Sequence, residues 1–416
     1  MSQLNRINLL LVFVIIAIAK FVEDIYSPLT LEIVNDLGML KSNMQHASSM
    51  YFSGFVVGVM IFGQLSDIIG RKRCVLICFL LIVLGISIFS NSHTIDTFYL
   101  GKFIQGAGSS MSSVLSQAIC RDVYEGKELS KVYGHAYYFS FFTKFMGILL
   151  GNYLAIQTNW RLGYYVVAPI LIALLLLNIF FLKETNPSTQ SQLFSKSFFK
   201  TLRTNFELFI LIFRSMIFDL NILLRAIIIG LSASIVFGIF YEAPFFYMGV
   251  LKLSSEAYSL VYLSFGIGMF LVGTLNNFLI KRIETRRIVE LTSFASGVLS
   301  FIFLGLIMVF QNFKSVYLNT ISITIISAIL QILIICLSFT TSNNILTSSF
   351  KNKTNIGISS SIFISMYYSI ITLMIFLIGS YSQLNLFSMP IILIILSSSV
   401  FLLTYLGFTF KKILKT

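Results

Sequence analysis

The feature that most constrains this chain is a succession of twelve apolar stretches, each close to the length of about 20 residues at which a helix crosses a bilayer. Only 11% of the residues are charged and 57% are hydrophobic, and the mean hydropathy is +0.90. A soluble core cannot absorb so much apolar surface in 416 residues, whereas a bilayer can. The stretches are 8–28, 46–66, 74–92, 97–118, 132–157, 162–182, 222–247, 257–279, 288–310, 315–340, 357–381 and 387–410.

The longest polar interruption, residues 183–220, divides these stretches six and six. We therefore expect an all-α membrane protein with twelve transmembrane helices, in an N-terminal half (1–182) and a C-terminal half (221–416) joined by a cytoplasmic loop. The first stretch continues past Lys20 to Pro28 without a small-residue cleavage site, which favours a retained span over a signal peptide.

The placement of basic residues predicts the orientation. Of the 29 Lys and Arg residues, 22 fall at the N-terminus, at the C-terminus or in alternate loops that would share one side with them, when the central loop is taken as far as Arg225. Four fall in the opposite loops and three within the stretches. This asymmetry predicts that both termini lie in the cytoplasm. The same distribution argues against a nucleic-acid partner, despite a net charge of +13.

Several other site classes lack support in the sequence. There is no Gly-x-x-x-x-Gly-Lys-Ser/Thr loop for a nucleotide, and no soluble segment that would hold a catalytic site. We therefore expect no cofactor and no enzymatic activity. The cysteines have neither paired nor metal-ligand spacing, so we expect buried thiols and no metal site. They are Cys74, Cys78, Cys120 and Cys336.

A short charged turn separates the second and third stretches and reads Gly-Gln-Leu-Ser-Asp-Ile-Ile-Gly-Arg-Lys-Arg over residues 63–73. Gly63 and Gly70 permit close helix approach and a sharp turn. Asp67 ends one helix with a negative charge, and Arg71 and Lys72 hold the loop in the cytoplasm.

This turn resembles the loop 2–3 signature of the major facilitator superfamily of secondary transporters. Residues 273–282 align with it at an offset of 210 residues, with Asn277 in place of Asp67. The resemblance implies the major facilitator fold, in which the two six-helix halves are related by pseudo-symmetry.

Further elements resemble the drug-resistance branch of that superfamily, which includes bicyclomycin exporters. Asp24-Ile25-Tyr26-Ser27-Pro28 resembles its Asp-x-Tyr-x-Pro element, and residues 102–108 resemble its Arg-x-x-Gln-Gly-x-Gly element, with Gln105 at the glutamine. The pairs Arg121-Asp122 and Trp160-Arg161 also match. The resemblance implies proton-coupled export of drugs.

Two departures from the branch leave the direction of transport open. Lys102 replaces the usual arginine, which keeps the charge but loses the planar fork of donors. The antiporter element of the fifth span has decayed: Gly147 and Gly151 remain, but the proline and the last glycine are missing. In the family that element is associated with export.

Ionisable residues at membrane depth usually mark function, because each costs at least about 2.5–3.5 kcal/mol on insertion scales. Lys20, Glu23 and Asp24 share one helix face, since they are three and four residues apart. A self-neutralising salt bridge is one interpretation. Two acids oppose one base, however, so we interpret Glu23 and Asp24 as the proton-coupling residues.

We expect Glu23 and Asp24 to face a central cavity between the helices, and other polar and aromatic residues of the spans to reach it. Glu242 could be a second protonatable group, a substrate contact or an interfacial residue. The candidate substrate cavity comprises Lys20, Tyr26, Lys102, Gln105, Tyr137, Phe141, Lys144 and Glu242.

A second set of residues is interpreted as a conformational latch at the cytoplasmic side. A carboxylate at Asp67 is expected to pair with a loop base and with the N-terminal backbone donors of a neighbouring helix when that side is closed. The set is Gly63, Asp67, Gly70, Arg71, Lys72, Arg121 and Asp122.

Two functional readings remain. The first is a proton-coupled exporter of drugs or other small amphipathic molecules, working by alternating access. The second is a proton-driven importer or a specific transporter of an anionic metabolite or siderophore, which the intramembrane lysines favour. A non-transporting membrane sensor or a lipid enzyme is a third, weaker possibility. In either transport reading the partners are a small molecule, protons and the bilayer, and we expect a monomer in a bacterial inner membrane.

Overall fold

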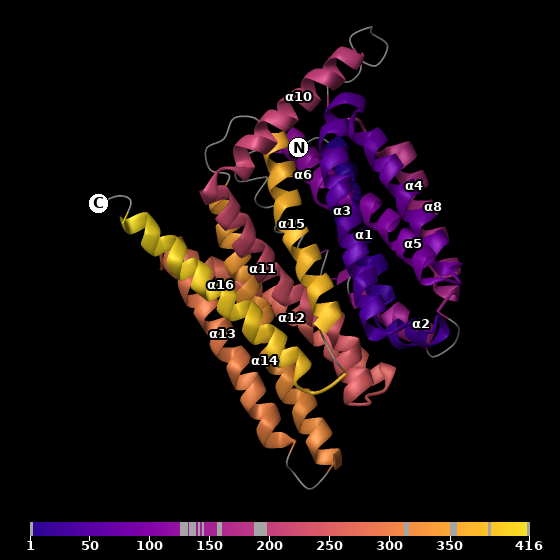
Figure 1. Cartoon of the computed structure of the whole chain (residues 1–416). Coiled ribbons are helices and arrows are strands. Elements are labelled where there is room, and N and C mark those ends of the chain that lie inside the picture. The colour runs from indigo at the N-terminus through magenta and orange to yellow at the C-terminus, as the bar shows by residue number, and fades with distance from the viewer. Residues whose placement is uncertain are drawn as a thin grey trace.

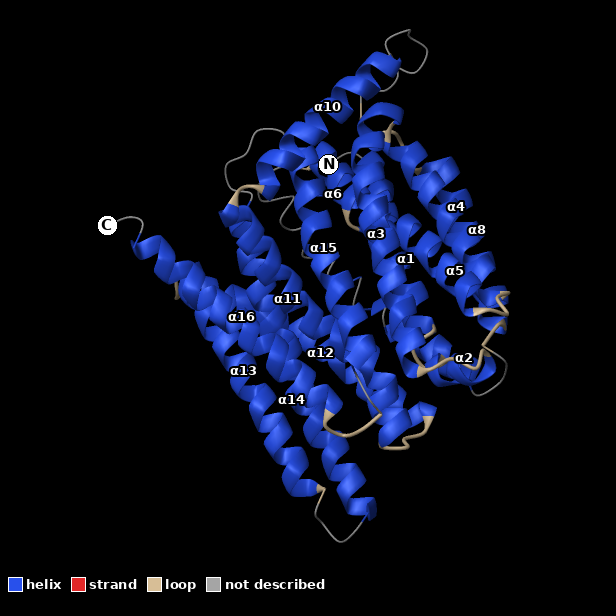
Figure 2. Cartoon of the chain, viewed as in Figure 1, coloured by secondary structure: helices blue, strands red, loops and turns tan. Residues whose placement is uncertain are grey.

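The protein is built from helices. The computed structural model describes residues 3–124, 132, 139, 142–143, 145–155, 160–186, 198–311, 316–349, 356–381 and 384–413, and these residues form no β-strand (Figure 2). The N-terminal helices are α1 (Gln3–Ile25), α2 (Thr30–Asp36), α3 (Lys41–Ile69), α4 (Arg71–Ser90), α5 (Ile95–Ser109), the short 3-10 turn η1 (Ser110–Ser112), α6 (Val114–Val123) and α8 (Leu162–Phe181).

The C-terminal helices begin with α10, which lies inside the stretch expected to be a loop. They are α10 (Phe198–Ile217), α11 (Leu220–Ala243), the π-helical turn η2 (Pro244–Val250), α12 (Ser255–Ile280), α13 (Thr285–Phe310), α14 (Val316–Ser349), α15 (Ile356–Tyr381) and α16 (Ser388–Ile413).

The predicted spans agree with these helices. Within the described residues, nine helices are long and apolar enough to cross a membrane. The remaining three stretches differ in local structure. The first contributes an apolar segment at Leu10–Ala19, and the fourth is split by η1 into α5 and α6. The fifth is described as an apolar helix over Phe145–Ala155.

The bundle has two distinct ends (Figure 1). We call the one that carries α10 and the first turn of α4, with its Arg71–Arg73 run, the basic end; the chain termini lie towards it. We call the opposite one the α2 end. The tight turn between α3 and α4 at the basic end requires Gly70, whose φ of 101° lies in a region that L side chains rarely adopt.

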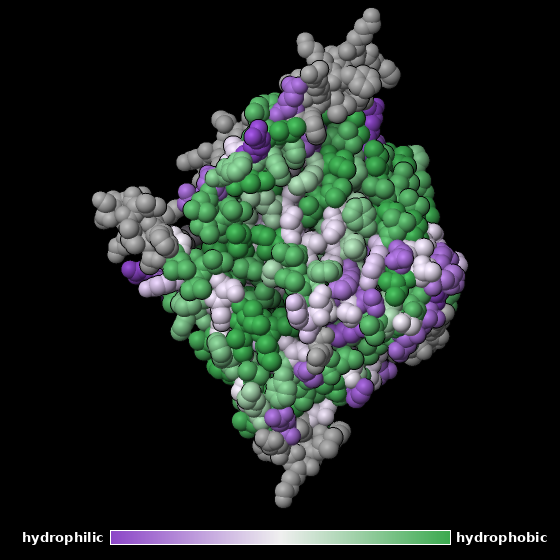
Figure 3. All heavy atoms as spheres, in the orientation of Figure 1, coloured by the Kyte–Doolittle hydropathy of each residue, from purple (hydrophilic) through white to green (hydrophobic). Residues whose placement is uncertain are grey.

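The outer surface of the bundle is apolar, as expected for helices that face lipid. Large hydrophobic side chains point outward along its length, among them Leu80 (56% exposed), Phe180 (75%) and Phe301 (57%). Figure 3 shows hydrophobic residues over much of the face in view, on either side of a band of paler and hydrophilic residues. Such exposure would be a liability in water and is the normal state in a bilayer.

The interior is packed as two large clusters of buried side chains. One involves mostly residues before Leu182 and the other mostly residues after Met216. A third, smaller cluster joins them, with Tyr51 and Phe52 of α3 against Ile371 and Ile375 of α15. The helices of the N-terminal cluster approach closely: a Cβ added at Gly106 of α5 would lie 1.9 Å from the Tyr51 carbonyl oxygen.

Candidate functional site

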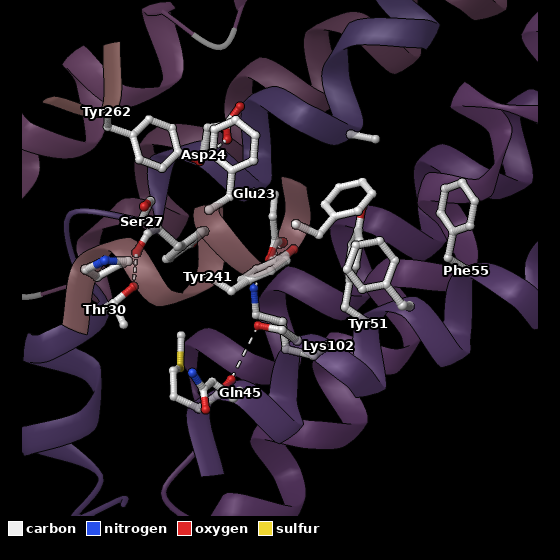
Figure 4. A pocket seen from close by; sticks show the side chains of 18 of the residues that line it. Glu23, Asp24, Ser27, Thr30, Gln45, Tyr51, Phe55, Lys102, Tyr241 and Tyr262 are labelled. Carbon is white, nitrogen blue, oxygen red and sulfur yellow. Dashed lines mark hydrogen bonds and ion pairs between the residues drawn. The ribbon is translucent and has the colours of Figure 1, made fainter. Parts of the chain in front are cut away.

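A cavity lies at the centre of the bundle, where α1, α3 and α5 face α11, α12, α14 and α15 (Figure 4). It encloses about 1080 Å³ of space free of protein atoms, part of it open to solvent. Eleven of the 23 described residues that line it are aromatic, so its walls are mainly apolar and polarisable. They are Tyr26, Tyr51, Phe52, Phe55, Phe237, Phe240, Tyr241, Phe245, Tyr262, Phe339 and Tyr368.

Glu23 of α1 lines this cavity and links the N-terminal and C-terminal helices. Its Oε2 accepts from Lys102 Nζ at 3.2 Å and from Gln105 Nε2 at 3.4 Å, both on α5. Its Oε1 accepts from the hydroxyl of Tyr241 on α11 at 3.4 Å. The two oxygens of one carboxylate therefore contact the two sets of helices.

Asp24, the next residue, lies deeper and is only 4% exposed. Its Oδ1 accepts a 2.9 Å hydrogen bond from the hydroxyl of Tyr262 on α12. One turn further along, the Ser27 hydroxyl lies 2.7 Å from that of Tyr258, also on α12. The face of α1 that carries the acids thus faces hydroxyl groups of the C-terminal helices (Figure 4).

Lys102 is enclosed, with 3% of its side chain exposed. Besides its ion pair with Glu23, its Nζ lies 4.7 Å from the centre of the Phe89 ring and 5.5 Å from that of Tyr26. A buried ammonium needs such compensation, because leaving water is costly for a compact charge.

Other candidate residues have different positions. Gln105 is fully buried and contacts Glu23, while the Tyr26 hydroxyl lies 3.4 Å from that of Ser90. Tyr137, Phe141 and Lys144 lie outside the described residues, and the side chain of Lys20 is likewise not described.

The decayed element of the fifth span packs against the acidic helix. A Cβ added at Gly151 would lie 2.1 Å from the carbonyl oxygen of Ile25. One added at Gly147 would lie 2.9 Å from the Phe21 carbonyl oxygen and 3.3 Å from Asp24 Cβ. The glycine pair is therefore needed for this close contact with α1, even without the proline.

Glu242 lies beside the cavity in an ion pair between α3 and α11. Its Oε2 lies 2.7 Å from Lys41 Nζ, and its Oε1 accepts a short hydrogen bond from Gln45. Glu242 is 2% exposed and the Lys41 side chain 9%. These contacts make Glu242 a buried bridge across the bundle, and it is not among the described residues that line the cavity. Its interpretation as a second protonatable group or a substrate contact stays a prediction.

The Trp160-Arg161 pair is held at the α2 end by two acids of the short helix α2. Glu32 accepts from the Trp160 backbone N–H at 3.0 Å, and Asp36 accepts from the indole N–H at 3.0 Å and from Arg161. The hydrogen bond from Arg161 is the main cause that lowers the pKa of Asp36. Burial is the main cause that raises the pKa of Glu32.

At the basic end, Arg71 is the centre of a charged cluster. It lies 2.6 Å from Asp67 and 3.1 Å from Asp122. Arg121 bonds to Gln117 at 3.4 Å rather than to this cluster. Gly63, one turn before Asp67, lies at the contact with α15, because a Cβ there would meet Ser361 Oγ at 2.3 Å.

The carboxylate at the N-terminus of α4 is Glu184, which the sequence analysis did not single out. It accepts from the backbone N–H groups of Arg71 at 3.0 Å and Lys72 at 3.2 Å, while Lys72 Nζ donates to the Ile179 carbonyl at 2.7 Å. The expected pairing of a carboxylate with helix N-terminal donors is present, but with Glu184 in place of Asp67.

A helical bundle that surrounds a charged, aromatic cavity and exposes an apolar surface is the arrangement of a membrane transporter. The chain belongs to the Major Facilitator Superfamily, whose family description it matches over residues 9–373. Its fold is accordingly the twelve-helix major facilitator fold.

The chain is also similar to known transporters in sequence and in fold. The chain is 32% identical over 285 residues to an uncharacterized transporter of Rickettsia bellii, covering 68% of this chain and 67% of that one. It is 26% identical over 160 residues to the multidrug resistance protein MdtL of Klebsiella pneumoniae, covering 38% of this chain and 41% of MdtL. A structure of the xylose transporter XylE from E. coli, partially occluded and inward open, superposes with a TM-score of 0.72 at 13% identity, over 97% of this chain and 98% of XylE.

Proposed function

We propose that this protein is a proton-coupled secondary transporter that exports drugs or other small amphipathic molecules by alternating access. The observation that carries the proposal is the pair of adjacent carboxylates on α1, each of which accepts a hydrogen bond from a tyrosine of the C-terminal helices. Proton binding at these residues would therefore act directly on contacts between the two sets of helices.

The coupling works through differential binding. Ionised Asp24 accepts from Tyr262, and hydrogen bonds to charged groups contribute about 1.5–3 kcal/mol each. Protonation weakens this bond and, at Glu23, the ion pair with Lys102. Because a ligand shifts a conformational equilibrium only by its differential affinity for the two states, a proton bound at these acids favours the state in which the contacts are broken.

The cavity favours an amphipathic substrate. Aromatic walls offer apolar area and ring faces that attract cations. The charged residues among its described lining are Glu23, Asp24 and Lys102, two acids and one base. A neutral or cationic amphiphile suits this balance, and the name of the relative MdtL supports a drug as substrate.

Import of an anionic metabolite or siderophore is the alternative, and Lys102 is the observation in its favour. A structural neighbour is described as a D-xylose-proton symporter, although at 12% identity its likeness concerns the fold. Against this alternative, the ammonium of Lys102 is already paired with Glu23 and enclosed by two rings. An anionic substrate would have to compete with Glu23.

The proposal extends to topology. It places the two halves at 1–182 and 221–416, the basic end in the cytoplasm of a bacterium and the protein in the inner membrane as a monomer. The basic residues of the first turns of α4 and α13 support this orientation, since cytoplasmic loops carry an excess of Lys and Arg.

Transport into membrane vesicles with an imposed proton gradient tests the function. For export, ethidium should accumulate in inside-out vesicles that are acid inside, and collapse of the gradient should release it. For import, succinate should instead accumulate in right-side-out vesicles that are acid outside. Equal ethidium uptake with and without the gradient would contradict proton coupling.

A further inference from the structure

The helix α10 lies on the surface of the bundle at the basic end. Figure 1 shows that it runs obliquely across this end and turns sharply into α11. It contacts α3 of the N-terminal helices as well as α11 and α15 of the C-terminal helices. Within the described residues, it is not among the helices that are long and apolar enough to cross a membrane.

One face of α10 packs against the bundle. Phe209, Ile212 and Phe213 are partly buried against the C-terminal cluster, and Met216 is 4% exposed. These residues are spaced as one side of a helix, so they form a single apolar face. That face holds α10 on the protein and leaves its other sides to the surroundings.

The sides of α10 that do not face the bundle are also apolar over its last turns. Large apolar side chains are exposed there, and the exposure continues through the junction into α11. They are Leu208 (39% exposed), Ile210 (42%), Leu211 (64%), Ile217 (37%), Phe218 (81%) and Leu220 (66%). So much exposed apolar surface in a short segment would be a liability in water.

The same helix is basic, with three bases and one acid. Lys200, Arg203 and Arg214 belong to one side of the helix, because they are 3 and 11 residues apart, or about one and three turns. Arg214 is exposed. Bases beside exposed apolar side chains suit a surface that is anionic and has an apolar layer beneath it.

The junction between α10 and α11 identifies this surface as the bilayer. α11 begins at Leu220, and the segment Leu220–Val250 is long and apolar enough to cross the membrane. The exposed Phe218 and Leu220 are therefore at the depth where a span enters the bilayer. Their apolar surface is continuous with the lipid-facing surface of the bundle, so the exposed sides of α10 adjoin lipid.

We propose that α10 is an interfacial helix that binds an anionic phospholipid surface. Its basic residues contact lipid phosphate groups, and its exposed apolar side chains enter the boundary between headgroups and acyl chains, about 5–10 Å deep for helices of this kind. Because α10 contacts both α3 and α15, bound lipid holds it across the end where the two sets of helices meet. The inference needs only that the chain spans a membrane, and not the proposed direction or proton coupling of transport.

Spin labels in lipid nanodiscs test the inference without measuring transport. A label replaces Leu211 in the full-length protein whose four cysteines are changed to alanine. Reference labels replace Asn35, an exposed polar residue of α2, and Leu80, which is 56% exposed on α4. Collisions with oxygen, which enters lipid, are compared with collisions with a water-soluble nickel chelate.

The result should depend on lipid charge. In nanodiscs that contain phosphatidylglycerol, we expect the ratio of oxygen to nickel collisions at Leu211 to be severalfold higher than at Asn35 and to approach that at Leu80. In phosphatidylcholine alone, nickel collisions at Leu211 should increase severalfold. This comparison uses the helix without charge substitutions, so it holds even if a charge variant fails to fold.

A charge variant assigns the effect to the bases of α10. In phosphatidylglycerol nanodiscs, Lys200→Gln/Arg203→Gln/Arg214→Gln should raise nickel collisions at Leu211 to the level seen in phosphatidylcholine. The anionic lipid then has no basic residue of α10 to bind, while the apolar side chains are unchanged.

The matched control is Lys281→Gln/Arg282→Gln/Arg287→Gln, which removes three exposed bases at the same end of the bundle and should leave nickel collisions at Leu211 unchanged. An equal increase in this control would overturn the proposal, as would collisions at Leu211 that match those at Asn35 in both bilayers. Dipolar broadening between the Leu211 labels of two copies, independent of lipid charge, would assign this face to a dimer instead.

Discussion

The two ends of the bundle use their charges differently. At the α2 end, polar groups join the N-terminal and C-terminal helices: Lys41 pairs with Glu242, and the ring of His46 lies 3.1 Å from the Ser380 hydroxyl. Asn152, beside the decayed fifth-span element, accepts from Ser255 of α12 at 2.9 Å. At the basic end, Asp67, Asp122 and Glu184 are bonded within the N-terminal helices.

This difference indicates at which end the loss of a charged side chain most easily shifts the equilibrium between open and closed states. Ion pairs and hydrogen bonds between the two sets of helices exist only while that end is closed, so removing one acts directly on the conformational equilibrium. Bonds within one set persist in both states and act mainly on stability. At the basic end, a contact across the bundle between described residues is one of packing, between Gly63 and Ser361.

The largest effect is expected at Asp24, whose partner Tyr262 lies across the bundle. Asp24→Asn keeps the size of the side chain but removes the proton-binding group, so we expect gradient-driven accumulation of substrate to be abolished. Exchange of substrate without a gradient should persist in part. Glu23→Gln should reduce accumulation less, because two of the three contacts described for Glu23, those with Lys102 and Gln105, lie within the N-terminal helices, and the third, from Tyr241 across the bundle, is 3.4 Å long.

Uptake and counterflow in reconstituted vesicles would measure both activities. If the Asp24→Asn protein still concentrates substrate with full dependence on the proton gradient, Asp24 is not the coupling residue. Tyr262→Phe is the matched variant, since it removes the hydrogen bond and leaves the acid in place. It should alter the pH dependence of uptake while retaining uphill transport.

The next largest effect is expected from the bridge at the α2 end. Removing one partner of a buried ion pair costs about 3–5 kcal/mol, because the other charge is left buried. Glu242→Gln should therefore shift the population towards a state open at the α2 end. Spin labels at Leu40 and Leu384, which are 71% and 59% exposed on the two sides, would report a longer distance.

The four cysteines are buried, and their replacement by alanine would provide the background for labelling. The exchange variant Lys41→Glu/Glu242→Lys restores opposite charges and should return the distance towards that of the unaltered protein. An unchanged distance in Glu242→Gln would show that packing, rather than this ion pair, closes the α2 end.

The sequence predicts the fold well and the site in part. Apolar length alone gives the spans, and helical spacing places Glu23 and Asp24 together, because both depend on local periodicity. The partners Tyr241 and Tyr262 could not be predicted, since a tyrosine in an apolar helix looks the same whether it packs or bonds. Glu184 was missed because it lies 113 residues from Arg71, so only the folded chain brings them together.

A smaller effect is expected at Asp67, which is either a latch on the closed state or a residue that only stabilises the N-terminal helices. Asp67→Asn should slow transport only severalfold, because Arg71 keeps its ion pair with Asp122. Substrate affinity should stay near normal, because Asp67 is not among the described residues that line the central cavity. If Asp67 is a latch, labels near Gly70, at the exposed position Arg73, and at Lys281 should also move apart, because Gly63 of the same helix as Asp67 contacts Ser361. Asn277→Ala should change transport much less.

Glu184→Gln separates an effect on stability from an effect on the conformational equilibrium at the basic end. It weakens the carboxylate cap of α4, and loss of an N-cap interaction typically costs about 0.5–2 kcal/mol of stability. We therefore expect a lower unfolding temperature without a change in the distance between the labels. A changed distance in this variant with none in Asp67→Asn would assign the latch to Glu184.

The smallest effect is expected from Asp36, which is bonded within the N-terminal helices at the α2 end. Its pKa is lowered, chiefly by the hydrogen bond from Arg161, so the folded protein favours the ionised carboxylate. A carboxyl with a lowered pKa adds stability above its unfolded pKa of about 3.9, and this stability is lost as the pH falls through the folded pKa. Asp36→Asn should therefore lower the unfolding temperature slightly at pH 7, and the difference from the unaltered protein should shrink as the pH falls below about 4. Because its side chain is 38% exposed, solvent screens much of the interaction.

Unlike Glu242→Gln, Asp36→Asn should leave the distance between labels at Leu40 and Leu384 unaltered. A shift of that distance would show that bonds within one set of helices also control access, and it would remove the distinction between the two kinds of contact.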